Sequence, residues 1–277
     1  MSTVPLVSVI IPTYNRAAWV KEAAASVLAQ TFRDYELIVV DDGSTDATLE
    51  ALIPLGLGGP LKVLRSKQRQ GVSAARNLGA AAAQGGWLAF LDSDDLWLPD
   101  KLARQVEYLR AHPELSICQT EEIWIRNGVR VNPPKTHRKR GGDIFLPSLE
   151  RCMVSPSAVM LHRRLFEALG GFDETFPAAE DYDLWLRIAW REPVGLVPEP
   201  LVIKRGGHPD QLSRQRALDR FRIRTLVKLL QEPALPGTYR QAARSTLAKK
   251  CRIYAQGCEK RGKTAEAQEF RALSCGL

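Results

Sequence analysis

The chain has 277 residues, of which 45% are hydrophobic and 25% are charged, as in an ordinary soluble globular protein. A chain of this length buries most of its surface without covalent staples, so collagen-like, disordered and disulfide-dense proteins are excluded. The formal net charge of +8 suits an anionic partner, but it does not choose among nucleic acid, a phosphorylated ligand and a lipid surface.

The cysteines and the N-terminus indicate a cytoplasmic protein. The five cysteines are odd in number and form no C-x-x-C pair, which favours reduced thiols over a disulfide or zinc framework. Residues 1–8 lack the basic and apolar regions of a secretory signal. No run of about 18 apolar residues is present, so we expect no membrane-spanning helix.

The first hundred residues alternate between short apolar runs and helical patterns. Four runs have the length and β-branching of buried parallel strands: Val7–Ile11, Glu36–Val40, Leu61–Leu64 and Trp87–Leu91. Helices are predicted between them at Ala17–Gln30, Asp46–Leu52 and Val72–Gln84. This order predicts an open α/β sheet, whose ligands bind beyond the carboxyl ends of its strands.

Polar clusters follow three of these strands. They are Pro12-Thr13-Tyr14-Asn15, Asp41-Asp42-Gly43-Ser44 and Asp92-Ser93-Asp94-Asp95. Each cluster alone is also typical of a turn or a helix cap. Three clusters at consecutive strand ends, two with adjacent carboxylates, favour a ligand or a cation that separates the like charges.

The elements predicted after this half are less regular. In chain order they are a helix from Pro99 to Ala111, a strand at Ser116–Ile125, a mobile loop at Asn132–Gly142, an apolar run at Val154–Leu161, a helix at Arg163–Leu169, a turn at Gly170–Asp173, a helix from Glu180, and a proline-broken strand at Val194–Ile203. From Gln211 onward the pattern becomes helical and basic, with 15 Lys and Arg against 5 Asp and Glu. Residues 1–210 hold 24 against 26, so the positive charge belongs to the tail.

Six motifs occur in a fixed order along the chain. They are SVIIPTYN at 8–15, VVDDGSTD at 39–46, GVSAARN at 71–77, FLDSDD at 90–95, GGFD at 170–173 and EDYDLW at 180–185. Together they resemble an inverting family 2 glycosyltransferase with the GT-A fold, over roughly residues 6–208. The resemblance implies a Rossmann-like, mostly parallel α/β sheet in a catalytic domain at 1–210, with a nucleotide-binding half (1–98) and an acceptor half (99–210). A basic α-helical tail at 211–277 would follow.

The resemblance also implies the roles of single residues. The nucleotide-sugar would be bound by Pro12, Thr13, Asn15, Asp41, Arg76, Asp92 and Ser93. Asp41 would accept from the N3–H of a uracil or similar base, and Asp92 would hold the ribose. Arg76 would contact the base or support this end of the pocket, although it could also be a counter-ion of Asp41. Asp94 would bind Mn²⁺ or Mg²⁺ with the diphosphate oxygens, whereas we expect Asp95 to cap the turn before Leu96.

Two aspartates compete for the role of catalytic base. Inverting transfer needs a carboxylate that takes the proton of the acceptor hydroxyl. Helical spacing puts Asp181 on the inward face with Leu184 and Trp185, and turns Asp183 about 160° away toward solvent. We therefore predict that Asp181 is the base; the competing interpretation is that it only stabilises the helix N-terminus.

Basic and aromatic residues complete the predicted site. The resemblance implies that His208 reaches the metal or the diphosphate, and a solvated loop histidine is the equal alternative. We place Trp124, Arg126 and the His137–Arg140 run on the acceptor side. The run would bind an acidic acceptor, help to close over the diphosphate, or form a solvated loop.

The predicted function is metal-dependent transfer from a UDP- or other NDP-sugar to a saccharide, lipid-linked or peptide-type acceptor, as in cell-envelope polysaccharide biosynthesis. No Walker or dinucleotide-binding glycine motif is present, and no nucleic-acid partner is expected. A sugar nucleotidyltransferase is a first alternative, although such an enzyme normally has a glycine-rich loop with a basic residue after the first strand. This chain has Pro12-Thr13-Tyr14-Asn15 there. A non-catalytic nucleotide-sugar scaffold is the second. The basic tail suggests peripheral contact with the inner face of an anionic membrane.

Overall fold

The computed structural model describes residues 4–56, 59–208, 211 and 218–275. Its centre is a nine-stranded sheet of order β3-β2-β1-β4-β8-β6-β9-β5, with β7 paired to β6. Four parallel strands form the first half: β1 (Val7–Thr13), β2 (Tyr35–Asp41), β3 (Leu61–Arg65) and β4 (Trp87–Phe90). They match the four predicted runs closely, because continuous β-branched sequence is typical of strands covered on both faces.

The second half of the sheet is mixed. β8 (Val159–His162) is antiparallel to β4 and to β6 (Ile117–Arg126), whereas β9 (Gly195–Gly206) is parallel to β6. Two short strands that the sequence analysis did not predict, β5 (Leu96–Trp97) and β7 (Val129–Val131), pair antiparallel with β9 and β6. The fold is therefore the expected α/β sheet, parallel where the nucleotide was predicted to bind.

Helices cover both faces of the parallel half. α1 (Ala17–Leu28) and α2 (Thr48–Gly56) lie on one face, and α3 (Val72–Ala82) lies on the other; α4 (Lys101–Ala111) continues the first layer over β6 and β9. β1 shows how alternation builds two cores: Val9 and Ile11 join the cluster under α1, whereas Ile10 joins the cluster under α3. A Cβ at Gly79 would lie 2.5 Å from Ile10 Cγ2, so only glycine lets α3 approach the sheet this closely.

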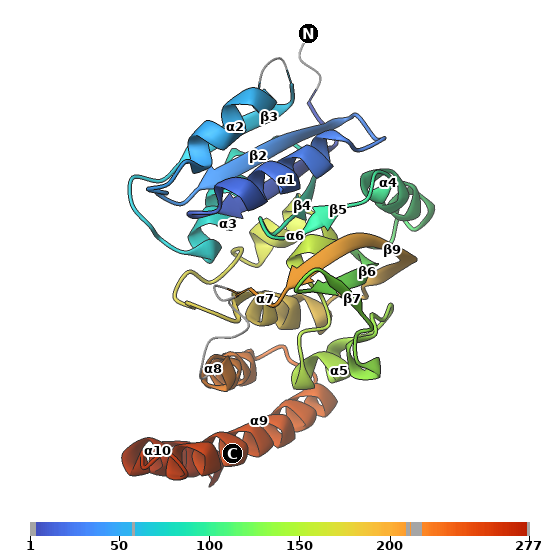
Figure 1. Cartoon of the computed structure of the whole chain (residues 1–277). Coiled ribbons are helices and arrows are strands. Elements are labelled where there is room, and N and C mark those ends of the chain that lie inside the picture. Colours follow the sequence, from blue (N-terminus) through green and yellow to red (C-terminus); the bar gives the residue numbers. More distant parts are fainter. Residues whose placement is uncertain (1–3, 57–58, 209–210, 212–217, 276–277) are drawn as a thin grey trace.

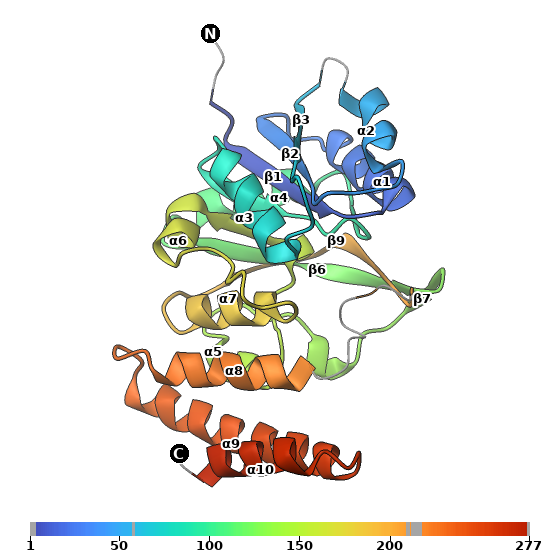
Figure 2. The same cartoon turned by 90° about the vertical axis from the view of Figure 1, so that its left-hand side faces the viewer.

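Three helices belong to the second half and three to the tail. They are α5 (Phe145–Glu150), α6 (Arg163–Ala168), α7 (Glu180–Ala189), α8 (Leu218–Leu230), α9 (Gly237–Glu259) and α10 (Thr264–Cys275). Figures 1 and 2 show the layers: α8 lies against α7, and α9 and α10 form the outer layer farthest from β1–β3. One cluster of buried side chains continues from β4 through α7 into all three tail helices. Within the described ranges, no helix is long and apolar enough to cross a membrane.

Candidate functional site

Three carboxylates follow the carboxyl end of β4. Asp92, Asp94 and Asp95 each offer one oxygen, and these oxygens lie within 4.8 Å of one another. Asp94 Oδ2 lies 2.8 Å from His208 Nε2 and 3.1 Å from Arg16 Nη1. The structure thus brings His208, from the end of the second half, against the predicted metal ligand. Three carboxylate oxygens this close together, with an imidazole beside one of them, fit a divalent cation such as Mn²⁺ or Mg²⁺.

The expectation that Asp95 caps the turn before Leu96 is wrong. Its buried carboxylate accepts hydrogen bonds from Ser157 Oγ at 2.6 Å and from the Arg205 N–H of β9 at 2.9 Å. Burial, reinforced by the charges of Asp94 and Asp92 and opposed by Lys204, raises the pKa of Asp95 to about 8. Asp95 therefore joins the β4 end to β9, which passes beside it only in the folded chain.

The loops after β1 and β2 form the end of the site that is predicted to hold the uracil or similar base of the nucleotide. Asp41 is buried at the end of β2, where Thr13 of β1 lies beside it in register. The Asp41 carboxylate accepts from the Ser44 N–H at 3.1 Å and lies 3.4 Å from Arg65 Nε. Asn15, at a φ of 50°, accepts from the Thr45 N–H at 2.8 Å and so ties the two loops together. Among the described residues, Thr13 Oγ1 and Asp41 Oδ2 lack a hydrogen-bond partner.

Pro12 and Ser93 border the same region. Pro12 is buried within β1, and the Ser93 hydroxyl accepts a bond of 3.4 Å from Arg16 Nη1. The first half thus gathers Pro12, Thr13, Asn15 and Asp41 at one end of its edge and Ser93 near Asp94. This is the placement that a nucleotide running from base to diphosphate would need.

Arg76 is the buried centre of a three-residue ion pair. Its guanidinium bonds Asp92 Oδ1 at 2.6 Å and Glu180 Oε1 at 2.7 Å, and only 2% of the residue is exposed. Burial alone would raise the pKa of Asp92, but Arg76 holds it below its ordinary value. The suggestion that Arg76 is a counter-ion of Asp41 is wrong: Arg65 lies beside Asp41, and Arg76 supports the ribose-binding candidate Asp92.

Asp181 lies in the first turn of α7 and is half-buried. Its Oδ1 accepts from the Tyr182 N–H at 2.7 Å, and its Oδ2 lies 3.4 Å from Cys152 Sγ. The charge of Asp181 also acts on Lys204 of β9, as do the charges of two metal-binding candidates, Asp92 and Asp95. Burial would lower the pKa of Lys204, but the charges of Glu122, Asp95, Asp92 and Asp181 raise it above its ordinary value. The geometric link between the two regions is Arg76, which bonds Asp92 after β4 and Glu180, the residue that precedes Asp181.

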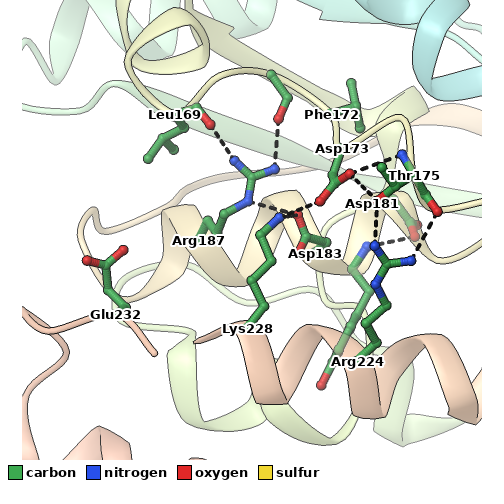
Figure 3. Close-up of polar contacts among 12 residues, drawn as sticks. Leu169, Phe172, Asp173, Thr175, Asp181, Asp183, Arg187, Arg224, Lys228 and Glu232 are labelled. Carbon is green, nitrogen blue, oxygen red and sulfur yellow. Dashed lines mark hydrogen bonds and ion pairs between the residues drawn. The ribbon is translucent and has the colours of Figure 1, made fainter. Parts of the chain in front are cut away.

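Asp183 is turned away from Asp181, as helical spacing predicted, but it does not face solvent. It is fully buried beneath α8, where its Oδ2 accepts from Arg187 Nε at 2.8 Å and from Lys228 Nζ at 3.2 Å. Lys228 also bonds Asp173 Oδ2 at 2.7 Å. Figure 3 shows these side chains gathered between α7 and α8. The prediction failed because the covering helix lies far along the chain.

This cluster predicts how firmly the tail holds α7. Lys228→Met is expected to lower the free energy of unfolding by about 1–2 kcal/mol, because Asp183 keeps only Arg187 as a charged partner. Lys249→Met is the matched control, since it breaks an exposed pair with Glu150 and should cost less than about 1 kcal/mol. Urea unfolding measures both. Equal small losses would show that the contact of the tail with α7 is no stronger than a surface pair.

The His137–Arg140 run is not wholly solvated. Lys139 is buried and pairs with Glu122 Oε1 at 3.2 Å, and Trp124 Nε1 donates to Glu122 Oε2 at 2.9 Å. Burial alone would raise the pKa of Glu122, but Lys139 and Lys204 lower it to about 2. The ring of His137 lies 5.5 Å from that of Trp124. The Asn132–Gly142 segment, predicted as a mobile loop, is thus anchored on β6 and contains a 3₁₀ turn.

Several charged residues of this site were not predicted from the sequence motifs. Arg16, Glu180 and Lys204 contribute charge at its centre, and Arg205 joins β9 to Asp95. Arg16 and Glu180 directly adjoin predicted site residues, and Lys204 precedes His208 by four positions. Their proximity to those motifs was the signal available. Which basic side chain turns inward depends on the pairing of β9, and no motif encodes it.

Solved structures first confirm the fold class. Staphylococcus aureus TarS 1–349 in complex with UDP-GlcNAc aligns with a TM-score of 0.76 over 95% of this chain and 80% of that chain, at 20% identity. The Pyrobaculum calidifontis mannosyltransferase PcManGT in complex with GDP-Man and Mn²⁺ aligns with a TM-score of 0.65 over 100% of this chain and 76% of that one, at 22% identity. The GT-A expectation is confirmed.

The family follows from sequence. The Glycosyl transferase family 2 model matches residues 8–170, and a Glycosyltransferase like family 2 model matches residues 144–216. The chain belongs to glycosyltransferase family 2. It is 34% identical over 187 residues to the Escherichia coli UDP-Glc:alpha-D-GlcNAc-diphosphoundecaprenol beta-1,3-glucosyltransferase WfgD, covering 66% of this chain and 69% of that protein. It spans only 31–58% of five uncharacterized Rickettsia glycosyltransferases, to which it is 32–34% identical.

Proposed function

We propose that the chain transfers a sugar from a nucleoside-diphosphate sugar to an acceptor hydroxyl, with inversion at the anomeric carbon. Asp181 is the base, and Asp94 and His208 bind the metal. One observation carries the proposal: the buried Arg76 pairs with Asp92, after β4, and with Glu180, which precedes Asp181 at the start of α7. A base and a diphosphate-binding end must face each other across the reacting carbon, and this ion pair supports their placement at one site.

The donor is held from base to diphosphate along the edge of the first half. Asp41 accepts from the base, Pro12, Thr13 and Asn15 line the nucleoside, and Asp92, supported by Arg76, holds the ribose. Asp41 Oδ2 lies 3.4 Å from Arg65 Nε but accepts no hydrogen bond among the described residues, so it is placed to accept from the N–H of a nucleotide base such as uracil. We propose a UDP-sugar as the donor, with another NDP-sugar as the alternative, since guanine also carries N–H donors; the names of the relatives mention UDP-Glc, UDP-GlcNAc and GDP-Man.

The reaction needs one proton transfer and one displacement. Asp181 takes the proton of the acceptor hydroxyl while the oxygen attacks the anomeric carbon. The bond from that carbon to the diphosphate oxygen breaks, and the nucleoside diphosphate leaves with the bonding electrons. Bound at Asp94 and His208, Mn²⁺ or Mg²⁺ would neutralise the departing charge. Lys204 adds a fixed positive charge beside the same path.

Residues of the acceptor half favour a particular class of acceptor. Trp124, with His137 and Arg126 beside its ring, offers an aromatic surface of the kind that packs against sugar rings, and we propose a saccharide or lipid-linked acceptor. The arginines at 244 and 252 are exposed on α9. They support peripheral contact with an anionic membrane face, where a lipid-linked acceptor would lie.

Product analysis tests the proposal directly. The full chain is incubated with UDP-glucose, UDP-GlcNAc or GDP-mannose and Mn²⁺, and nucleoside diphosphate and pyrophosphate are followed separately. Slow release of the nucleoside diphosphate that a chelator suppresses is the expected result. Pyrophosphate release would instead indicate the nucleotidyltransferase. Donor binding without release, even with saccharide and lipid-linked acceptors present, would favour the scaffold.

Asp41→Asn is expected to weaken UDP binding about 10- to 100-fold, because a bond to a charged acceptor becomes a neutral one. Isothermal titration with UDP measures the change. Asp100→Asn, at the start of α4 on the exposed surface, is the control and should bind UDP normally. Unchanged affinity in a folded Asp41→Asn protein would show that the uracil or similar base of the nucleotide binds elsewhere.

A further inference from the structure

Cys152 contacts the predicted base although no motif includes it. It follows α5 and lies against the start of α7, with Sγ 3.4 Å from Asp181 Oδ2 and 3.0 Å from the Val154 carbonyl oxygen. Both are within reach of a thiol donor, and the contact to the carbonyl oxygen is the shorter. The one thiol proton faces two acceptors, and the carboxylate is the stronger because it is charged.

The surroundings of Cys152 keep it a donor. Burial raises the pKa of this thiol well above its ordinary range, and the charge of Asp181 raises it further, against the smaller opposing effects of Lys139 and Lys204. A thiolate is therefore disfavoured here, and the neutral S–H group is what the carboxylate meets. This distinguishes Cys152 from a reactive cysteine, which lies in a positively charged environment that lowers its pKa.

The Asp181 carboxylate is held at both oxygens. Oδ1 accepts from the Tyr182 N–H at 2.7 Å, and Oδ2 faces Cys152. Two donors from different segments restrict rotation of the carboxylate plane, which a single contact would leave free. Each oxygen accepts more than one hydrogen bond, so capacity remains for the proton of an acceptor hydroxyl.

We propose that Cys152 is a positioning residue for the transfer reaction, in that its thiol fixes the orientation in which Asp181 receives the acceptor proton. The proposal rests on the proposed function, because it needs Asp181 to be the base. Misorientation of a reacting group costs rate even when binding is intact. The effect of losing Cys152 is therefore expected in kcat rather than in the KM for the donor.

Steady-state kinetics of Cys152→Ala and Cys152→Ser test this. The alanine variant is expected to lose about 5- to 20-fold in kcat with an unchanged donor KM, and serine, which keeps a donor, is expected to restore most of the loss. Cys251→Ala removes a buried thiol from α9 and is the matched control, with lowered stability and normal kcat. Wild-type kcat in folded Cys152→Ala, or equal losses in the alanine and serine variants, would overturn the proposal.

Thiol labelling provides a readout that is independent of activity. In Asp181→Asn the carboxylate charge is lost, so alkylation of Cys152 by iodoacetamide, followed by mass spectrometry, is expected to be several-fold faster than in the wild type. Equal rates would show that the two side chains do not interact in solution. The failures are distinguishable. Full transfer by Asp181→Asn would remove the proposed base, whereas an inactive Asp181→Asn with wild-type behaviour of Cys152→Ala would remove only the positioning role.

Discussion

Asp181→Asn is expected to bind the nucleotide-sugar as the wild type does and to lose about 10³-fold in turnover, the upper range of what a general base contributes. The amide keeps the shape and the hydrogen bond of Oδ1 but cannot take a proton. Donor binding by titration calorimetry and single-turnover kinetics separate the two effects. The amide variant avoids the cavity that alanine would create beside Cys152.

The carboxylate two residues further on serves as the matched control. Asp183→Asn removes a charge that Arg187 and Lys228 neutralise beneath α8, so it should lower stability and leave the turnover of the folded fraction nearly unchanged. Asp219→Asn, exposed at the start of α8, should change neither. Full turnover by Asp181→Asn, or loss of turnover only in Asp183→Asn, would transfer the role of base away from Asp181.

Asp94→Asn is expected to weaken Mn²⁺ binding and turnover by more than about 100-fold, since even the outer partners of metal ligands contribute about 10- to 100-fold. Its Oδ2 is the oxygen that both His208 and Arg16 contact, so its charge is central to the cluster. Electron paramagnetic resonance of free Mn²⁺ measures the affinity without relying on activity. Chelation should stop transfer in the wild type, and added Mn²⁺ or Mg²⁺ should restore it.

The companion variant for this experiment is His208→Ala. A loss of Mn²⁺ affinity that is smaller than that of Asp94→Asn would place the imidazole at the metal, and unchanged affinity and turnover would leave it a loop residue. Turnover by Asp94→Asn that resists a chelator would contradict metal dependence altogether. Arg16 and Lys204 would then be the cations available to the diphosphate.

The parallel half of the fold was predictable because its signals are local. A buried strand such as β1 is apolar over most of its length, and its exit has to be polar if a ligand binds there. The positions of Asp41 and Asp94 at strand ends could be predicted for this reason. The missed elements are those that long-range pairing creates: β5 has two residues and exists through β9, and β7 exists through β6.

The second half resisted prediction where distant segments decide burial. Prolines suggested that the strand at Val194–Ile203 is broken, yet β9 runs from Gly195 to Gly206. The register shifts opposite Glu121 accommodate Pro198 and Pro200, as prolines in sheets require. Asp183 and Lys139 were expected at the surface and lie buried because α8 and β6 supply their counter-ions. Composition near a residue cannot reveal a partner that lies far along the chain.

The buried ion pair at Arg76 limits how the molecule can open. It joins Asp92, at the end of the first half, to Glu180, at the start of α7 in the second. A hinge between the halves would have to pull a guanidinium that is 2% exposed away from one partner, at a cost of about 3–5 kcal/mol. A rigid-body opening motion of the two halves is thus disfavoured. Donor and acceptor must instead reach a site whose two halves keep their spacing, and we expect the adjustment that admits them to fall to the surrounding loops.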